Sequence, residues 1–165
     1  MFKNLFQKKV KTQTEEIYSP LTGEIISLAE VPDPVFSNKM MGDGIAIIPK
    51  EGKLVSPVEG EIVQVFPTKH AIGIKSVRGL EILIHVGLET VDLKGEGFET
   101  FVEEGQSVKA GDVLSTFDIH FLESKNKEIV TPIIITNTLD KLDDMEQFST
   151  SEVSRQELIL KCNLK

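Results

Sequence analysis

Glycine and proline interrupt this chain at short intervals between Ser19 and Gly111, so a long helix does not fit there. Short runs rich in β-branched residues lie between these turn signals, at 24–26, 45–48, 61–65, 82–86, 113–117 and 133–135. Short strands separated by turn residues are typical of an antiparallel β-sandwich or barrel. Only two stretches, 97–104 and 139–148, have the pattern of short helices. We therefore predict an all-β fold.

One ten-residue segment of the chain returns 37 residues later. Ser19-Pro-Leu-Thr-Gly-Glu-Ile-Ile-Ser-Leu is matched by Ser56-Pro-Val-Glu-Gly-Glu-Ile-Val-Gln-Val, and five of the ten positions are identical. The match continues past the Pro-x-x-Gly turn, which is common by itself, into the following strand-like run. We therefore expect the sandwich to contain a duplicated half-motif.

Two histidines lie on neighbouring strand-like runs. His70 belongs to 66–76 and His85 to 80–90, and the short turn 77–79 between them predicts a hairpin. If the loop holds an even number of residues, the two imidazoles share one face of the ribbon, whereas an odd loop weakens this argument. A shared face indicates a nucleophile with a helper, or two ligands of a metal. His120 has no such partner, and we interpret it as structural or solvated.

Composition and charge limit the classes of function. The chain has 165 residues, enough for one domain, and a net charge of −8, which argues against a nucleic-acid partner. Cys162 is its single cysteine, which excludes an internal disulfide and zinc sites built from several cysteines. No apolar stretch approaches 18 residues and no signal-peptide pattern opens the sequence, so a cytoplasmic protein is expected.

The charge is unevenly distributed. Residues 1–11 carry four lysines and no acid, so the remainder carries 14 bases against 26 acids. We predict a flexible basic tail at 1–15 and a single domain at 16–165. A weak tether to a membrane surface remains the alternative for the tail, because its apolar side chains could share one helical face.

The segment 34–44 is too broken by proline and glycine to form a regular core element, yet it is apolar. Its large side chains are Val35, Phe36, Met40 and Met41. Such a loop either tucks under the domain or forms an exposed patch, and both readings stay open. Consecutive methionines suit an adaptable contact surface, because the unbranched thioether repacks against different partners.

Several motifs in one order resemble the glucose-class enzyme IIA of the bacterial phosphoenolpyruvate-dependent sugar phosphotransferase system. The resemblance covers about residues 16–162, and its matching segments are Tyr18-Ser-Pro-Leu-Thr-Gly-Glu, Val31-Pro-Asp-Pro-Val-Phe, Met41-Gly-Asp-Gly-Ile-Ala-Ile, Val55-Ser-Pro-Val-Glu-Gly, Phe66-Pro-Thr-Lys-His-Ala, Leu83-Ile-His-Val-Gly-Leu-Glu-Thr-Val, Lys94-Gly-Glu-Gly-Phe and Thr131-Pro-Ile-Ile-Ile-Thr-Asn. It implies an antiparallel β-sandwich with a duplicated motif.

The resemblance also implies a phosphocarrier function and a set of site residues. His85 would accept the phosphoryl group from a histidine phosphocarrier protein and pass it to the IIB domain of a sugar permease. His70 would assist the transfer, and Thr68 would orient His70. No cofactor is required in such a scheme. The docking surface would be apolar and would comprise Val35, Phe36, Met40, Met41, Phe66, Ile72 and Leu83.

Two other classes of function are weighed against the phosphocarrier. A zinc hydrolase on a similar duplicated β fold needs a further histidine or aspartate, and two protein ligands leave zinc short of a tetrahedral set. Zinc bound by His70 and His85 is therefore expected only where a partner completes the site. A regulator that binds other enzymes through the apolar patch is compatible with phosphotransfer, because a phosphoryl group adds about −1.5 to −2 charge there.

Overall fold

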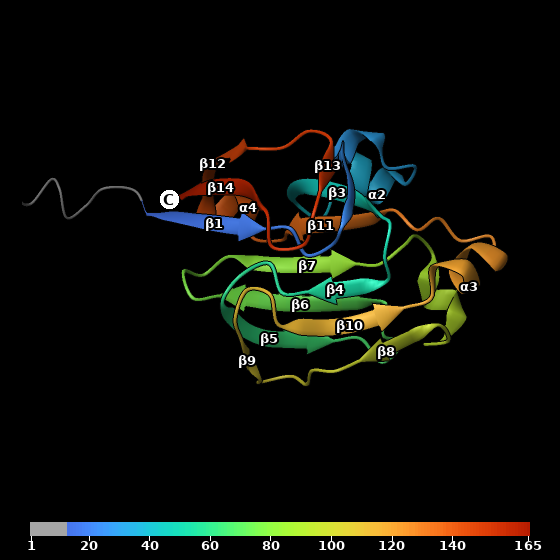
Figure 1. Cartoon of the computed structure of the whole chain (residues 1–165). Coiled ribbons are helices and arrows are strands. Elements are labelled where there is room, and N and C mark those ends of the chain that lie inside the picture. The colour runs from blue at the N-terminus through green and yellow to red at the C-terminus, as the bar shows by residue number, and fades with distance from the viewer. Residues whose placement is uncertain (1–12) are drawn as a thin grey trace, which may run out of the picture.

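The computed structural model describes residues 13–165, and β-strands dominate this part of the chain (Figure 1). Antiparallel strands form one eight-stranded sheet, which runs in the order β13 (Glu152–Val153), β2 (Gly23–Ser27), β3 (Asp43–Pro49), β11 (Thr131–Ile135), β7 (Glu81–His85), β6 (Ala71–Ser76), β5 (Gly60–Val65) and β9 (Ser107–Val108).

Two three-stranded antiparallel sheets complete the fold. One has the order β1 (Thr14–Tyr18), β14 (Leu158–Leu164), β12 (Leu142–Gln147), and the other has the order β4 (Lys53–Val55), β10 (Val113–Phe117), β8 (Phe98–Thr100). The main hydrophobic core joins all three sheets, for example through Ile17 of β1, Leu114 of β10 and Ile84 of β7. The predicted all-β architecture is confirmed as a sandwich.

The central strands of the long sheet are buried on both faces. On β7, Ile82 and Ile84 pack into the main core, whereas Leu83 between them faces a second apolar cluster with Leu28 and Phe36. Burial on both faces explains why 82–84 is a continuous apolar run. A slip of one residue in register would exchange the two faces, so the pairing of β7 with its neighbours is strongly specified.

The duplicated half-motif is confirmed by the hydrogen bonds of its two copies. Tyr18 N–H donates to the Pro57 carbonyl at 3.0 Å, and Val55 N–H donates to the Pro20 carbonyl at 2.9 Å. The two bonds are equivalent by the repeat, because Tyr18 corresponds to Val55 and Pro20 corresponds to Pro57. The same relation orders the long sheet, where β13-β2-β3-β11 is followed by β7-β6-β5-β9. The molecule is therefore built from two similar halves that meet between β11 and β7.

The helix predicted at 97–104 is wrong, and the one predicted at 139–148 is correct only in its first residues. The segment 97–104 contains β8 instead, because Phe98 pairs with Phe117 of β10 and is buried. The segment 139–148 begins in the short helix α4 (Thr138–Lys141) and continues as β12, since β14 offers its backbone as a partner. The other helical turns are η1 (Leu28–Glu30), α2 (Pro34–Ser37), η2 (Thr90–Leu93) and α3 (Ile119–Ser124).

The first described strand, β1, begins before the expected domain boundary at residue 16. Thr14 and Glu15 belong to β1, where they pair with Asn163 and Cys162 of β14. The remainder of the predicted tail, residues 1–12, lies outside the described residues. Within residues 13–165, no helix is long and apolar enough to cross a membrane.

Candidate functional site

The structure brings His70 and His85 together at one end of the β6–β7 hairpin. His85 is the last residue of β7, and His70 immediately precedes β6. The centroids of the two rings lie 4.8 Å apart, and the ring planes meet at 80°. His120 is exposed on α3, which agrees with a solvated side chain.

The two rings meet for a different reason than the one the sequence suggested. Ala71, not His70, pairs with His85, because the turn 77–79 holds an odd number of residues. A regular ladder would place His70 opposite Val86 and on the other face of the ribbon. His70 instead lies in a turn where Lys69 adopts a left-handed φ of 63°. This turn redirects the imidazole, while the Val86 N–H still donates to the His70 carbonyl at 2.7 Å.

Hydrogen bonds assign the proton of the His85 ring. Nδ1 of His85 lies 2.7 Å from the carbonyl oxygen of Gly87. Because a carbonyl oxygen only accepts, the ring nitrogen must donate, which places the proton of the neutral ring on Nδ1. Nε2 then carries the free lone pair. On the other ring, Nδ1 of His70 lies 2.8 Å from the Thr68 hydroxyl oxygen.

Both imidazoles are held in the neutral form at pH 7. Burial, together with the neighbouring His85, lowers the pKa of His70 to about 4. Burial also lowers the pKa of His85, although the Gly87 carbonyl and the charge of Asp33 oppose the shift. A neutral imidazole has a nitrogen lone pair available for attack on an electrophile.

Most of this chain is similar to known proteins. Residues 15–141 match the family model described as phosphoenolpyruvate-dependent sugar phosphotransferase system, EIIA 1. This chain belongs to that family. The glucose-specific EIIA component of Bacillus cereus is 62% identical over 138 residues, which cover 84% of each chain. That of Halalkalibacterium halodurans is 50% identical over 167 residues, covering 97% of this chain and 96% of the relative.

A solved structure shares the same fold. The glucose permease IIA from Mycoplasma capricolum superposes with a TM-score of 0.85 at 43% identity, over 90% of this chain and 96% of that one. The enzyme IIA family supplies phosphotransfer components of the sugar phosphotransferase system. The present chain is therefore a phosphocarrier of that system.

The apolar residues expected to form the docking surface of this enzyme IIA divide into three groups. Phe36 and Leu83 are buried beneath the site, and the Phe36 ring centroid lies 5.2 Å from that of His85. Phe66 and Met41 are half-buried, and the Phe66 ring centroid lies 5.4 Å from that of His70. The exposed members are Val35, at 40% exposure, and Met40, at 71%. The loop 34–44 therefore contributes both to the apolar core, through Phe36, and to the exposed surface, through Val35 and Met40.

Ile72 does not belong to this surface, and its assignment was wrong. It pairs with Ile84 on β7 and is 1% exposed within the main core, on the opposite face of the sheet from Leu83. Gly73, opposite Leu83, holds the corresponding position on the site face. The alternation of side chains along a strand decides this, since neighbouring residues point to opposite faces.

Asp33 is a site neighbour that the sequence reasoning missed. Its carboxylate accepts a hydrogen bond from the Val35 N–H at 3.0 Å and caps α2, where Pro34 takes the first helical position. This negative charge favours the protonated form of His85. Asp followed by Pro is a helix-start signal, and it could have located the short helix that carries Phe36.

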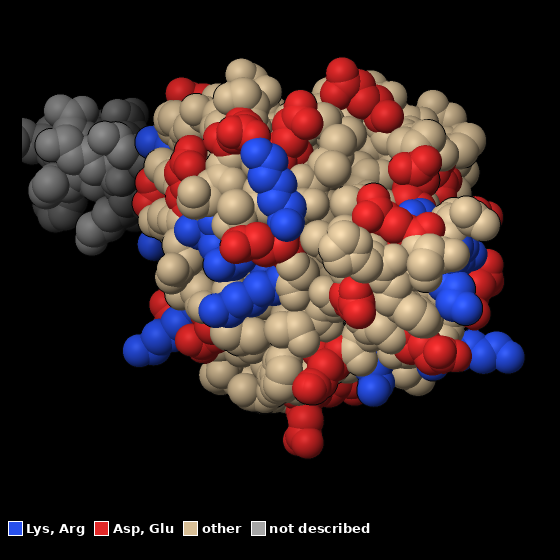
Figure 2. Space-filling view, turned by 45° about the vertical axis from the view of Figure 1, so that its right-hand side comes forward, with Lys and Arg blue, Asp and Glu red and all other residues tan. Residues whose placement is uncertain are grey.

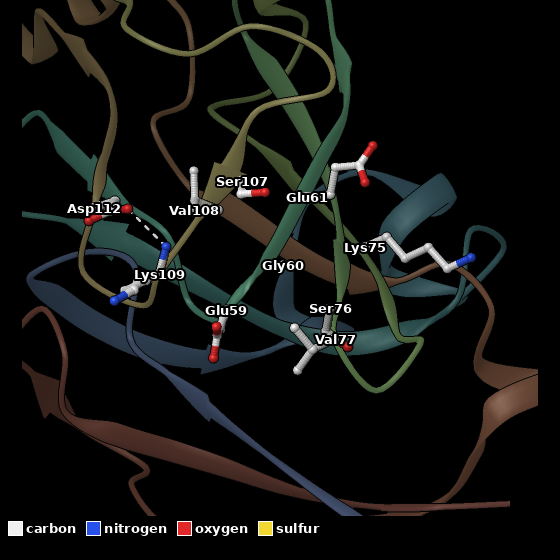
Figure 3. Close-up of a pocket in the computed structure, with 10 residues that line it drawn as sticks. All are labelled: Glu59, Gly60, Glu61, Lys75, Ser76, Val77, Ser107, Val108, Lys109 and Asp112. Atoms are coloured by element: carbon white, nitrogen blue, oxygen red, sulfur yellow. Dashed lines mark hydrogen bonds between the residues drawn. The ribbon is translucent and has the colours of Figure 1, made fainter.

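One cavity of the described residues is shown in Figure 3. It has a volume of about 590 Å³, and neither histidine lines it. Its lining residues come from β5, the end of β6 and β9, and they are Glu59, Gly60, Glu61, Lys75, Ser76, Val77, Ser107, Val108, Lys109 and Asp112. Val77 follows the end of β6 opposite to His70. This cavity is therefore separate from the histidine pair.

Charges on the molecular surface are mixed (Figure 2). Acidic and basic side chains are interspersed with uncharged residues on the face that Figure 2 shows. Within residues 13–165, no cluster of three or more histidine, cysteine, aspartate or glutamate side chains could hold a metal ion. The histidine pair alone offers two nitrogens, fewer than a tetrahedral zinc site needs.

Lowering the pH from 7 to 5 is expected to destabilise the protein through His70. The folded-state pKa of about 4 lies below the ordinary value of 6.5, so the unfolded chain binds a proton between these values that the folded protein does not bind. The stabilisation is complete above the unfolded pKa and is lost as the pH falls toward the folded pKa. The free energy of unfolding should drop by about 2 kcal/mol at pH 5.

Urea unfolding of the wild type and of His70→Gln at pH 7 and pH 5 measures this effect. The loss of stability in His70→Gln should be smaller by about 2 kcal/mol. His120→Gln, which removes an exposed histidine, should lose as much as the wild type. Equal losses in the wild type and in His70→Gln would show that burial does not keep His70 neutral.

Met40 and Phe36 are expected to respond differently to substitution. Met40→Lys should leave the melting temperature unchanged and weaken partner docking about fivefold, because the side chain is exposed. Phe36→Ala should lower the free energy of unfolding by about 3–5 kcal/mol, because the ring is buried. Thermal unfolding and the concentration dependence of phosphoryl transfer separate the two effects.

Val77→Lys is the matched control for the docking experiment. Val77 is 65% exposed and lies in the turn at the far end of the β6–β7 hairpin from His85, so this substitution should change neither stability nor transfer. A loss of transfer in Val77→Lys as large as in Met40→Lys would mean that added positive charge, not local contact, weakens docking.

Proposed function

We propose that this enzyme IIA accepts a phosphoryl group on Nε2 of His85 from a histidine phosphocarrier protein and passes it to the IIB domain of a sugar permease for glucose-type sugars. The observation that carries the proposal is the hydrogen bond from Nδ1 of His85 to the Gly87 carbonyl. It leaves the Nε2 lone pair free for attack, on the ring that is the less buried of the two.

The transfer forms a bond between Nε2 and phosphorus while the bond from phosphorus to the donor histidine breaks. Such a loose transition state spreads charge over the three phosphoryl oxygens, so positioning and charge stabilisation matter most. The donor ring keeps the electron pair of the broken bond. In the second transfer, the roles reverse and His85 becomes the leaving group.

His70 assists as a hydrogen-bond donor to the phosphoryl oxygens. We assign the Thr68 hydroxyl as the donor to Nδ1 of His70, across the observed 2.8 Å. The neutral His70 ring then carries its proton on Nε2, where it can be donated to an oxygen. Burial of His70 keeps the ring neutral and fixed, so little reorganisation accompanies the transfer.

The partners dock on the apolar surface around Val35 and Met40, which are exposed on the same loop that brings Phe36 to His85. Phosphorylation adds about −1.5 to −2 charge at the centre of this surface. Regulatory target enzymes that prefer a neutral apolar face would therefore bind the unphosphorylated form. Zinc would bind His70 and His85 only when a partner carboxylate completes the set of ligands. The reaction takes place in the cytoplasm, where its donor and acceptor domains meet.

The test is phosphorylation of the full chain from phosphoenolpyruvate with the two general proteins of the phosphotransferase system. We expect one acid-labile phosphate per chain, and phosphorus–nitrogen couplings in NMR spectra should locate it on Nε2 of His85. Addition of a IIB domain should then remove the phosphate. A phosphate on Nδ1, on His70 or on a hydroxyl group would overturn the assignment.

A further inference from the structure

The loop that follows β7 is fixed by a buried hydroxyl group that the proposed mechanism leaves without a role. Thr90 is the first residue of η2 and is 0% exposed. Its Oγ1 donates a hydrogen bond to the Val86 carbonyl at 2.6 Å. The bond joins the two ends of the segment 86–90, which includes Gly87, the residue whose carbonyl group contacts the His85 ring.

The Val86 residue connects this hydroxyl group to both histidines. Its carbonyl accepts the bond from Thr90, and its N–H donates to the His70 carbonyl at 2.7 Å. The next carbonyl along the chain, that of Gly87, accepts the proton of His85 Nδ1. The peptide unit that Thr90 contacts is thus adjacent to the one whose carbonyl group determines the tautomer of His85.

Gly87 is the residue of this loop whose backbone dihedral angles would be the least restricted without further contacts. Its φ of 75° lies in the left-handed region, where glycine has wide conformational freedom. Two bonds remove that freedom. Thr90 fixes the peptide unit before Gly87, and the Leu88 N–H, which donates to the Glu128 carbonyl at 3.0 Å, fixes the peptide unit after it. Together they aim the Gly87 carbonyl at Nδ1.

The methyl group of Thr90 also contacts this glycine. A Cβ atom at Gly87 would lie 2.7 Å from Thr90 Cγ2 and 2.8 Å from the Glu128 carbonyl oxygen. The loop therefore packs tightly between Thr90 and the Glu128 backbone. A threonine supplies both the methyl contact and the hydrogen bond, whereas valine or serine supplies only one of them.

We propose that Thr90 is a positioning residue, whose hydroxyl group fixes the peptide unit before Gly87 and thereby holds the His85 proton on Nδ1 and the lone pair on Nε2. The inference rests on the proposed function of His85 only for its effect on transfer. Its effect on the tautomer concerns the unphosphorylated protein, and it can be measured without any phosphoryl donor.

Thr90→Val and Thr90→Ser separate the hydroxyl group from the methyl group. Nitrogen chemical shifts of the His85 ring in the full chain, between pH 6 and pH 8, report the tautomer. We expect a single Nδ1–H tautomer in the wild type and in Thr90→Ser, and a mixture of tautomers in Thr90→Val. The initial rate of phosphoryl acceptance should fall about tenfold in Thr90→Val, the order expected for one lost hydrogen bond, and should be largely retained in Thr90→Ser.

Ser56→Ala is the matched control. Ser56 is 1% exposed, and its hydroxyl group donates to the Val58 carbonyl at 2.7 Å, in a turn before β5 that does not touch the histidines. It should lose stability without any change in the His85 tautomer or in the transfer rate. If Thr90→Val fails to fold, Thr90→Cys compared with Thr90→Ser gives the same contrast, since a thiol is a weak donor.

An unchanged tautomer in the variant without the hydroxyl group would overturn the inference. So would a rate loss that follows stability equally in Thr90→Val and Ser56→Ala. Failure of the proposed function has a different signature, because the wild type itself would then take up no phosphate on His85, whatever the tautomer measurements show.

Discussion

Replacing His85 with glutamine should abolish phosphoryl acceptance. The amide nitrogen of glutamine has no lone pair available for attack, because it is delocalised into the carbonyl group, so the nucleophile disappears while a polar side chain of similar reach remains. His85 is only half-buried at the end of β7, and the free energy of unfolding should change by about 1 kcal/mol or less. Incorporation of labelled phosphate from phosphoenolpyruvate measures the loss.

His120→Gln is the control for this experiment. His120 is exposed on α3, and its variant should take up one phosphate per chain at the rate of the wild type. Circular dichroism and urea unfolding establish that both variants are folded. One phosphate per chain in His85→Gln would move the acceptor to another residue, and His70 would be the first to be tested.

His70→Gln should slow the onward transfer of the phosphoryl group by roughly 10²–10³, or about 2.7–4 kcal/mol, as is typical when one positioned donor to a developing charge is lost. The His70 ring lies 4.8 Å from the His85 ring, centroid to centroid, and is held by Thr68 and by Phe66. A flexible glutamine amide would not be held in the same orientation. Acceptance measured at equilibrium needs only the His85 nucleophile, so it should still reach one phosphate per chain.

The two half-reactions separate these effects. Isolated phosphorylated His70→Gln is mixed with an unphosphorylated IIB domain, and loss of label is followed by rapid quenching. Thr68→Val should slow the same step to a smaller extent, because it leaves the His70 ring in place and removes only the hydroxyl contact. Onward transfer at the wild-type rate in His70→Gln would mean that His70 has no part in the transition state.

The sequence indicated the histidine pair but could not show how it forms. Strand periodicity assumes a regular ladder, and in such a ladder His70 would face away from His85. The left-handed Lys69 makes the difference, and lysine gives no signal for this conformation. Local composition also could not separate Phe36, which is buried, from Met40, which is exposed. Both belong to one apolar loop, and only the path of α2 over the sheet distinguishes them.

The fold was predictable where short-range patterns agree with long-range pairing. The repeat beginning at Ser19 and Ser56 predicted two similar halves, and reciprocal hydrogen bonds join them. Prediction failed where a distant strand decides the local structure. Leu139, Leu142 and Met145 have helical spacing, yet residues from Leu142 onward pair with β14, which is far along the chain. Tertiary pairing of this kind overrides local preference.

The two halves of the molecule use the same connection in different ways. The connection between β2 and β3 spans residues 28–42 and brings Phe36 to His85, whereas its counterpart between β5 and β6 spans only residues 66–70 and carries Thr68 and His70. Under the proposed function, the long connection contacts the partner proteins, and the short connection carries the residues that assist phosphoryl transfer. A duplicated scaffold therefore allows mutations to alter partner choice in one loop while the transfer step in the other is left intact.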